Sequence, residues 1–278
     1  MAGIRVVTDS AADIPADLVE RYDIRVVPLD VRLGDWGTEE MRHVDAAEFW
    51  RRCETTSALP ETSAPSPGAF AESFTQAAED GCDGVICLTL AAGLSATYQS
   101  ACTGANEVRD QIQVRTLDTR AVSLGQMMVV LETAKAARET NDLDAAEAVA
   151  RAVIPKIRVY AALNTLDNAR KGGRIGKLTG LVGSLLAIKP VVEISGVARD
   201  ESRQRTRIGS LRYLADLLRN AGPLAAVGVA HSAALDLEVF LDMLNGIFPR
   251  EDIVVSYLGP VIGTHAGPKA MGLCYELA

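Results

Sequence analysis

Residues 84–90 have the sequence GVICLTL, a nearly unbroken apolar run that predicts a strand buried on both faces of a sheet. A short stretch of small and hydroxyl residues follows it, and residues 95–110 are then predicted to form a helix. The same alternation continues on either side, with strands predicted at 4–8, 25–31 and 113–118 and helices at 16–21, 68–79 and 123–139. Strands joined by crossover helices form parallel sheets, so residues 1–152 are predicted to be a parallel-sheet α/β domain.

The second half of the chain has a different pattern. Strands are predicted at 159–163, 191–194, 225–230 and 253–258, and helices at 164–171, 181–189, 210–220 and 235–245. Pro190 divides the apolar stretch 181–194 into a helix and a strand. We therefore predict a second domain, residues 153–278, with a mixed sheet, and a cleft where the two α/β domains meet.

Composition excludes several classes of protein. Apolar residues make up 48% of the 278 residues, which allows a substantial core, whereas aromatic residues make up 5%, too few for surfaces that stack single-stranded nucleic acid. The five cysteines include no Cys-x-x-Cys pair, so neither a disulfide framework nor a zinc site is predicted. No apolar run reaches membrane-spanning length, and the opening residues lack a signal peptide. We expect a soluble cytoplasmic protein without a metal.

Charge is unevenly distributed along the chain. Residues 1–150 carry 12 Lys and Arg against 25 Asp and Glu, whereas residues 151–278 carry 16 against 11, within a total of −8. Arginines gather in the second half at positions 199, 203, 205, 207 and 212. Such a cluster is either a solvated surface or a docking surface for an acidic or nucleotide-bearing partner. The overall acidity argues against nucleic acid as that partner.

Three stretches combine hydroxyl residues with glycine and proline: TSAPSP at 62–67, GLSATY at 93–98 and GTHAGP at 263–268. Converging hydroxyls and backbone N–H groups can hold a small anionic group without lysine or arginine. Ser and Thr in such stretches also cap helices and close turns, so each hydroxyl alone has a structural explanation. Together the three loops predict a site for a buried acid group.

Five segments carry a resemblance to a known family: TDSAADIP at 8–15, TSAPSPG at 62–68, LSATYQSA at 94–101, KGGRI at 171–175 with IKP at 188–190, and GTHAGP at 263–268. In order and spacing they resemble the DegV family, fatty-acid-binding proteins that act as acyl carriers for a bacterial fatty acid kinase. The resemblance runs almost end to end. It implies two α/β domains with a fatty acid such as palmitate, stearate or oleate buried at their junction.

The resemblance also implies residue roles. The carboxyl group is expected to be held by Thr62, Ser63, Ser95, Ala96 and His265. Arg174 and Thr97 are expected to contact either the head group or the kinase. Ala96 and Lys269 stand where the family commonly has glycine, so the head-group contacts are where this chain departs from its relatives.

The implied function is that of a carrier without catalytic residues or a cofactor. A separate kinase subunit would bind ATP and dock on Arg199, Arg203, Arg205 and Arg207. A monomer with transient contact to the membrane surface is expected.

A serine hydrolase is the competing class. Ser95 would be its nucleophile, with His231 or His265 and Asp118 or Asp236 as the other members of a triad. The stretch GLSAT at 93–97 ends in threonine where a nucleophile elbow requires glycine, which argues against this class. A phosphate-binding loop is also excluded, because Leu178 follows Gly176-Lys177 where that loop requires Ser or Thr.

Overall fold

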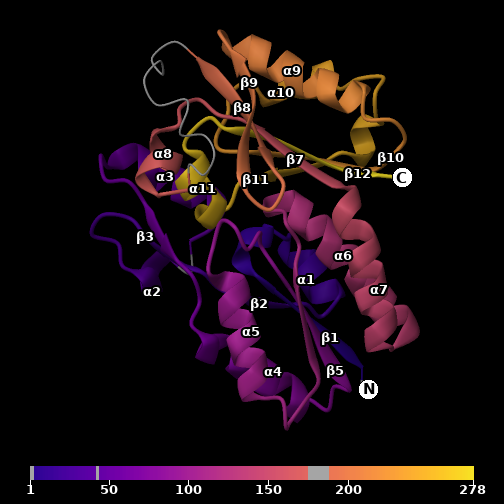
Figure 1. Ribbon diagram of the computed structural model, residues 1–278. Helices are drawn as coiled ribbons and strands as arrows, with labels where there is room; N and C mark the ends of the chain where they lie inside the picture. The colour runs from indigo at the N-terminus through magenta and orange to yellow at the C-terminus, as the bar shows by residue number, and fades with distance from the viewer. Residues whose placement is uncertain (1–2, 42–43, 175–187) are drawn as a thin grey trace. The chain divides into compact units, whose positions relative to one another are not determined.

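The computed structural model describes residues 3–41, 44–174 and 188–278 (Figure 1). It forms two compact units. Unit 1 comprises Met1–Asp30 and Ser63–Lys156, and unit 2 comprises Val31–Thr62 and Ile157–Ala278. The break after residue 156 is close to the predicted domain boundary at 152, but the segment 31–62 was expected in the first domain and belongs to unit 2.

Unit 1 is built on a four-stranded parallel sheet, as predicted. Its strands are β1 (Ile4–Asp9), β2 (Arg25–Val27), β5 (Gly84–Thr89) and β6 (Val114–Asp118), in the order β2-β1-β5-β6. All three strand pairings are parallel. Every residue of β5 is buried, which agrees with the apolar run that predicted it.

Helices cover both faces of this sheet. The helices of unit 1 are α1 (Ala16–Arg21), α4 (Pro67–Glu79), α5 (Thr97–Glu107), α6 (Ser123–Thr140) and α7 (Leu143–Val153). Val7 of β1 shares a core cluster with Phe70 and Phe74 of α4. The next residue, Thr8, points to the opposite face, where its hydroxyl accepts a hydrogen bond of 3.0 Å from Gln126 of α6. Because β1, β5 and β6 are parallel, their carboxyl ends lie at one edge of the sheet. Ser10, Ser95 and Ser123 are carried by the segments that follow these three ends.

A buried carboxylate ties two strands together at that edge of the sheet. Asp9, fully buried at the end of β1, accepts hydrogen bonds from the backbone N–H of Leu90 (2.8 Å) and of Ala11 (3.0 Å). Burial raises the pKa of Asp9 to about 6, because the two N–H donors only partly replace the water that stabilises its charge. Asp9 thus occupies the gap between the carboxyl ends of β1 and β5.

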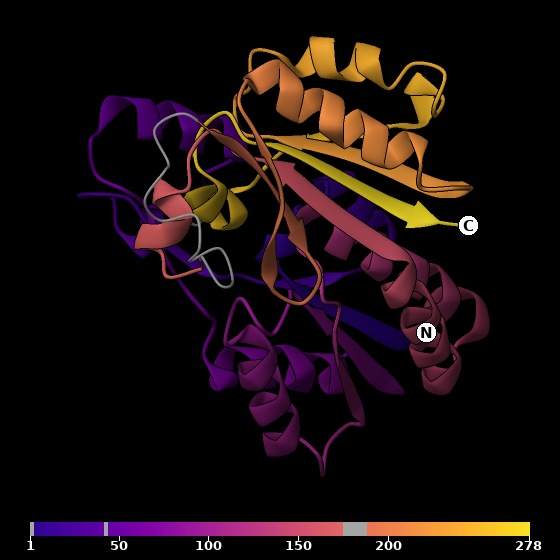
Figure 2. The same cartoon turned by 45° about the horizontal axis from the view of Figure 1, so that its top comes forward.

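Unit 2 contains the predicted mixed sheet. Its strands are β7 (Ile157–Ala162), β8 (Lys189–Ile194), β9 (Ala198–Gln204), β10 (Leu224–His231), β11 (Val254–Tyr257) and β12 (Met271–Leu277), in the order β11-β10-β12-β7-β8-β9. Among the described strands of this sheet, only β10 and β11 pair in parallel. Helices α9 (Arg207–Arg219) and α10 (Leu237–Met243) cover one face of this sheet and bury Leu211, Leu214 and Phe240 against it (Figure 2).

The segment between the two parts of unit 1 carries β3 (Asp30–Arg32), α2 (Thr38–Met41), α3 (Ala46–Thr55) and β4 (Glu61–Ser63). Strands β3 and β4 pair as a two-stranded sheet. Phe49 and Trp50 of α3 are buried, and the Trp50 indole N–H donates a hydrogen bond of 3.1 Å to the carbonyl of Leu258. This long-range packing explains why the segment belongs to unit 2 and not to the domain that surrounds it in sequence.

Two helices complete the part of unit 2 that carries the site, α8 (Asp167–Lys171) and α11 (Pro260–Ala266). The sequence predicted a loop at 263–268, but residues 263–266 form the last turn of α11. Pro260 is in the first turn, where its missing N–H costs nothing, and Gly267 ends the helix with φ +76°. The predicted helix at 181–189 lies almost entirely outside the described residues.

Candidate head-group site

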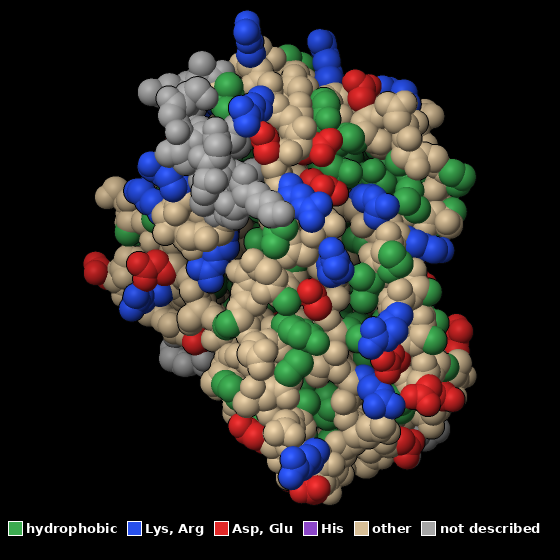
Figure 3. All heavy atoms as spheres, in the orientation of Figure 1, with side chains coloured by type: hydrophobic (Ala, Val, Ile, Leu, Met, Phe, Trp, Pro, Cys, Tyr) green, Lys and Arg blue, Asp and Glu red, His purple; other side chains and the backbone are tan. Residues whose placement is uncertain are grey.

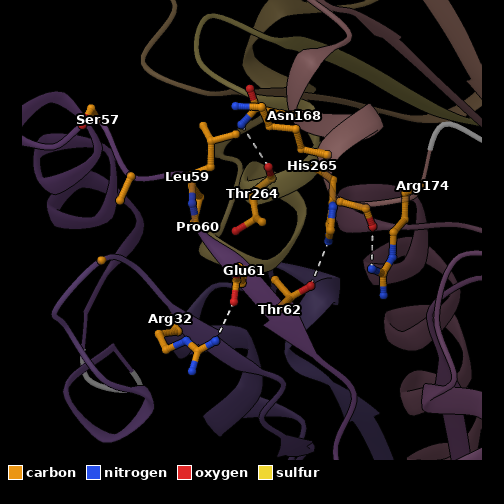
Figure 4. Close-up of a pocket in the computed structure, with 14 residues that line it drawn as sticks. Arg32, Ser57, Leu59, Pro60, Glu61, Thr62, Asn168, Arg174, Thr264 and His265 are labelled. Carbon is orange, nitrogen blue, oxygen red and sulfur yellow. Dashed lines mark hydrogen bonds and ion pairs between the residues drawn. The ribbon is translucent and has the colours of Figure 1, made fainter.

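The imidazole of His265 and the hydroxyl of Thr62 share a hydrogen bond of 2.8 Å between Nε2 and Oγ1 (Figure 4). His265 is near the end of α11, and Thr62 is the central residue of β4. The two residues are 203 positions apart in sequence, and both belong to unit 2. The structure therefore brings together two of the five residues that were expected to hold a carboxyl group.

Glycines set the position of the His265 ring. A Cβ atom on Gly172 would lie 2.4 Å from His265 Nδ1, closer than any real contact, so only glycine leaves room for the ring. On the other side of α11, a Cβ on Gly263 would lie 2.5 Å from Cζ2 of Trp50. Gly172 is thus needed for the close packing of the His265 ring, and Gly263 for the close packing of α11 against Trp50.

Asn168 connects the two helices that flank the site. Its side chain is buried on α8, and its Nδ2 donates a hydrogen bond of 3.1 Å to the carbonyl of Thr264 on α11. Gly267 allows this approach, because a Cβ there would lie 2.8 Å from Asn168 Oδ1. The helices α8 and α11 are consequently held at a fixed separation, with Gly172 and His265 in contact between them.

Burial keeps His265 neutral. Its pKa is lowered to about 4, first because the ring is removed from water and second because the guanidinium of Arg174 lies nearby. Nδ1 of the ring is buried and has no hydrogen-bond partner among the described residues. At neutral pH the site therefore offers an uncharged imidazole and a hydroxyl to a ligand.

A cavity of about 780 Å³ opens beside Thr62 and His265. Its lining combines polar residues, among them Asn168 and Thr264, with an apolar part that includes Leu59 and Pro60 (Figure 4). Four charged side chains line it, namely Arg32, Glu61, Lys171 and Arg174. All of its lining residues belong to unit 2.

Other expected carboxyl-binding residues lie in unit 1. Ser95 is half-buried in the turn before α5, and its Oγ shares a hydrogen bond of 2.8 Å with Oγ1 of the buried Thr97. Ser95 Oγ also accepts a bond of 3.3 Å from the Thr97 N–H, so it closes the turn at the helix start. Ala96 is the exposed N-cap of α5 and makes no side-chain capping bond, and Ser63 is the exposed last residue of β4.

Comparison with known proteins decides the family. The DegV family model matches residues 3–278. The chain belongs to the DegV family. A DegV domain-containing protein of Streptomyces coelicolor is 34% identical over 276 residues, which cover 97% of each chain. A fatty-acid-binding DegV family protein of Thermus thermophilus is 30% identical with a TM-score of 0.85, covering 99% of this chain and 100% of its own. DegV of Bacillus subtilis, a fatty acid binding protein, is 27% identical with a TM-score of 0.90 over the whole of both chains.

Membership of the DegV family agrees with the fold described above. The parallel sheet of unit 1 and the mixed sheet of unit 2 match the solved DegV structures, as the resemblance implied. None of the helices in the described ranges has the length and apolar character to span a membrane. Within those ranges no three His, Cys, Asp or Glu side chains are grouped as metal ligands.

The geometry does not assemble the triad of a serine hydrolase. Asp236 is engaged in a bidentate pair with Arg207, with N···O distances of 2.8 and 3.0 Å. Asp118 accepts hydrogen bonds from the backbone N–H groups of Ala92 and Arg120. Across the described residues no carboxylate is hydrogen-bonded to a histidine, so neither imidazole is oriented as a general base would be.

The second histidine, His231, ends β10 and is buried. Its ring lies 4.4 Å from the ring of Tyr257 on the neighbouring strand β11. Burial lowers its pKa. These contacts give His231 a packing role.

The four arginines of the expected docking surface differ in their exposure and in their ion pairs. Arg199 and Arg205 are exposed, and no ion pair of either is found within the described residues. Arg203 pairs with Asp200 at 2.7 Å on the same strand. Arg207 is half-buried and fixes the start of α10 through Asp236, so its first role is structural. On the face shown in Figure 3, Lys and Arg side chains are interspersed with acidic and apolar ones and do not form a continuous basic field.

Sequence reasoning missed several residues of the site. Asn168, Trp50 and the pair Arg32–Glu61, whose side chains meet at 2.6 Å across β3 and β4, were given no role. Trp50 was a usable signal, because a buried indole N–H needs a partner. Nothing in the local pattern distinguishes Asn168 or Glu61 from an ordinary polar surface residue.

Proposed function

We propose that this protein binds a long-chain fatty acid and presents its carboxyl group to a separate ATP-dependent kinase. The observation that carries the proposal is the neutral pair of Thr62 and His265 at the edge of a polar cavity. The fatty acid binding of the Thermus and Bacillus DegV proteins supports it. The protein itself acts as a carrier and supplies no catalytic residue or cofactor.

The head-group contacts must supply the selectivity. Burying about fourteen CH₂ groups from water contributes roughly 11 kcal/mol at about 0.8 kcal/mol each. A fatty acid that leaves a membrane is already in an apolar phase, so this contribution largely cancels. Each hydrogen bond to the carboxylate is then worth about 1.5 to 3 kcal/mol and distinguishes the acid from neutral lipids. In our proposal the Thr62–His265 pair of unit 2 provides one of these bonds, because the hydrogen bond between the two side chains uses one of their two protons.

The proposal includes the other residues that the family resemblance implied for the carboxyl group. Ser95 and Ser63 would donate to the same carboxyl group, with the backbone at Ala96 as a further donor. The bond between Ser95 and Thr97 supports this role, because Thr97 fixes the position of the Ser95 hydroxyl. The methyl group of Ala96, where relatives commonly have glycine, would limit how closely the head group approaches.

The proposed reaction takes place on the kinase. A carboxylate oxygen of the bound fatty acid attacks the γ-phosphorus of ATP, the bond to the β,γ-bridging oxygen breaks, and ADP and an acyl phosphate are formed. A carboxylate held by hydroxyls and a neutral imidazole keeps more nucleophilic character than one neutralised by arginine. Arg174 lines the same cavity, and in this proposal it contacts either the head group or the kinase.

The kinase is proposed to dock on the exposed arginines Arg199, Arg203 and Arg205. Arg207 belonged to the expected docking set, but its guanidinium is engaged by Asp236 and is therefore less available to a partner. We further propose a cytoplasmic monomer that touches the membrane surface transiently to exchange lipid. These assignments would be tested by kinase pull-down and vesicle exchange with the purified protein.

The binding proposal can be tested directly. Native mass spectrometry of the freshly purified protein should show a co-purified fatty acid, and the delipidated protein should take up palmitate or oleate. A protein that is free of lipid in every preparation and takes up neither acid would refute the proposal.

The carboxyl clamp is tested with the double variant Thr62→Ala, Ser95→Ala. We expect palmitate affinity to fall at least about a hundredfold, because two charge-assisted hydrogen bonds are lost. The matched control is Thr103→Ala, Ser256→Ala, whose hydroxyls donate only to nearby backbone carbonyls of their own helix or strand. Equal affinity of the two double variants would contradict the assignment of the clamp.

A further inference from the structure

The hydrogen bond between His265 and Thr62 has two possible directions (Figure 4). A neutral imidazole carries one proton, on Nδ1 or on Nε2, and its other nitrogen is an acceptor. If Nε2 carries the proton, it donates to Thr62 Oγ1; if Nδ1 carries it, Thr62 donates to Nε2. The direction matters because a hydroxyl has only one proton, and Thr62 cannot donate it both to the ring and to a ligand.

The ring of His265 carries a single proton at neutral pH. Its pKa is lowered to about 4 by burial and by the nearby charge of Arg174, so the doubly protonated form is a negligible fraction. Nε2 faces Thr62. The surroundings of the other nitrogen, Nδ1, therefore decide where the proton lies.

Nδ1 is enclosed on the side of Gly172. It is shielded from solvent and has no hydrogen-bond partner among the described residues. A Cβ atom on Gly172 would lie 2.4 Å from Nδ1, so the Cα of this glycine packs directly against the nitrogen. The polar groups of Gly172 are engaged elsewhere: its N–H donates to the carbonyl of Asn168 at 2.9 Å, and its carbonyl accepts from Arg174 at 2.7 Å. Gly172 thus presents a Cα–H group to Nδ1 and not an acceptor.

A nitrogen enclosed in this way suits a lone pair better than an N–H group. A buried N–H without an acceptor loses its hydrogen bonds to water and gains none in return. A lone pair also loses its bond to water, but a neighbouring Cα–H group is a weak donor and partly replaces that bond. The surroundings of Nδ1 therefore favour the ring proton on Nε2, the nitrogen that is hydrogen-bonded to Thr62.

We propose that His265 carries its proton on Nε2 and acts as a positioning residue for the hydroxyl of Thr62. Nε2 donates to Thr62 Oγ1, and Oγ1 donates its own proton to the ligand. The inference rests on the proposed function, because the ligand group that it requires is a carboxylate. Gly172 has a second role in this arrangement besides making room for the ring, since its Cα is the group that Nδ1 faces.

The direction of the bond gives the site a chemical preference. With the proton on Nε2, Thr62 is a donor toward the ligand, and the oxygens of a carboxylate are acceptors only. With the proton on Nδ1, Thr62 would donate to the ring and offer the ligand only lone pairs, which repel a carboxylate. The head group is thus selected as an acceptor at this position. A fatty amine is disfavoured by the same contact, because its ammonium group has donors only.

The position of the proton is measured by NMR of the delipidated protein with ¹⁵N-labelled histidine. The chain has three histidines, and the signals that are absent from His265→Gln identify the ring. At neutral pH we expect Nδ1 to have the chemical shift of an unprotonated nitrogen and Nε2 that of a protonated one. The opposite assignment would overturn the proposal, as would shifts averaged equally between the two forms.

Two substitutions of His265 separate positioning from packing. Glutamine can place its amide N–H close to the position of Nε2, whereas leucine fills the space of the ring and has no donor. We expect palmitate affinity to stay within about threefold of the wild type in His265→Gln and to fall about fivefold to tenfold in His265→Leu. A ring that only fills space predicts the reverse order.

A double-mutant cycle tests whether His265 acts through the hydroxyl of Thr62. Thr62→Val removes the hydroxyl and keeps the shape of the side chain, and it should lower palmitate affinity about tenfold. In Thr62→Val, His265→Leu the loss should equal that of Thr62→Val alone within about twofold, because no hydroxyl is left to position. Losses that multiply would show two independent contacts and overturn the positioning role.

These results separate the inference from the proposed function. A wild-type protein that takes up no palmitate would overturn both. Palmitate binding with Nδ1 protonated, or with the reverse order of the two His265 variants, would overturn the positioning role and leave fatty acid binding intact. We expect palmitate binding, a proton on Nε2, and a loss of affinity in His265→Leu but not in His265→Gln.

Discussion

Replacing Gly172 with alanine is expected to move the His265 ring away from Thr62. Gly172 has right-handed helical backbone angles that alanine adopts readily, so the change adds no backbone strain. The new Cβ would lie 2.4 Å from Nδ1 and 2.8 Å from Cε1 of His265. The ring must therefore shift by more than half an ångström, roughly, to reach an ordinary contact distance, and the 2.8 Å bond to Thr62 would be lost.

The size of the effect follows from these contacts. Overpacking costs about 1 to 3 kcal/mol, and a lost hydrogen bond about 0.5 to 1.5 kcal/mol. Alanine also lowers the conformational entropy of the unfolded chain, which offsets about 0.4 to 1 kcal/mol of this destabilisation. A net destabilisation of about 1 to 3 kcal/mol is expected. If His265 also loses its contact with a bound carboxylate, palmitate affinity should fall about tenfold.

Gly173→Ala is the matched control on the neighbouring residue. A Cβ there would meet nothing within 4 Å, but Gly173 has φ +71°, so alanine is strained by about 1 to 2 kcal/mol. The two variants should have similar stability by urea unfolding and different affinity for palmitate. NMR titration of the His265 ring provides a second measurement, because displacement into water should raise its pKa from about 4 toward 6.5 in Gly172→Ala only. A ring that still titrates near 4, with wild-type affinity, would refute this account of the site.

Three further predictions concern the remaining charged groups. The pKa of Asp9 is raised to about 6 from an ordinary value of 3.8, so the folded state binds more protons than the unfolded state between these values, and stability should fall by about 2 kcal/mol as pH rises from 4 to 6. Asp9→Asn should abolish this component in urea unfolding measured across that range, and an unchanged profile would contradict it. Arg199→Glu with Arg205→Glu should slow acyl phosphate formation by the kinase without altering palmitate binding or stability. Arg207→Ala should instead lower the unfolding free energy by about 1 to 2 kcal/mol, since it leaves Asp236 half-buried without its partner. If Arg207→Ala slows acyl phosphate formation without a loss of stability, and the Arg199 and Arg205 variant does not slow it, then Arg207 is the docking residue.

The two sheets illustrate which elements a sequence reveals. β5 was predicted because six consecutive buried residues leave an unmistakable apolar run. β9 was not predicted, because its sequence ARDESRQ is that of a polar edge strand and resembles a charged loop. β12 was also not predicted, although it is central in the sheet and nearly all buried, since its MGLCYEL follows a glycine-rich stretch that had been interpreted as a loop. Pairing partners, and not local pattern, made both of them strands.

The sequence alone determined the α/β class and the change from a parallel to a mixed sheet; the roles of Thr62 and His265 were implied by the family resemblance and stay a prediction. These features depend on the periodicity and composition of neighbouring residues, which are properties of a linear chain. Only the tertiary structure decided that residues 31–62 join the second unit, that Gly172 makes room for a buried neutral histidine, and that Lys171 and Arg174 line one cavity with Thr62. Those facts depend on close packing between segments up to about 200 residues apart. No local sequence pattern indicates which of these distant segments contact one another.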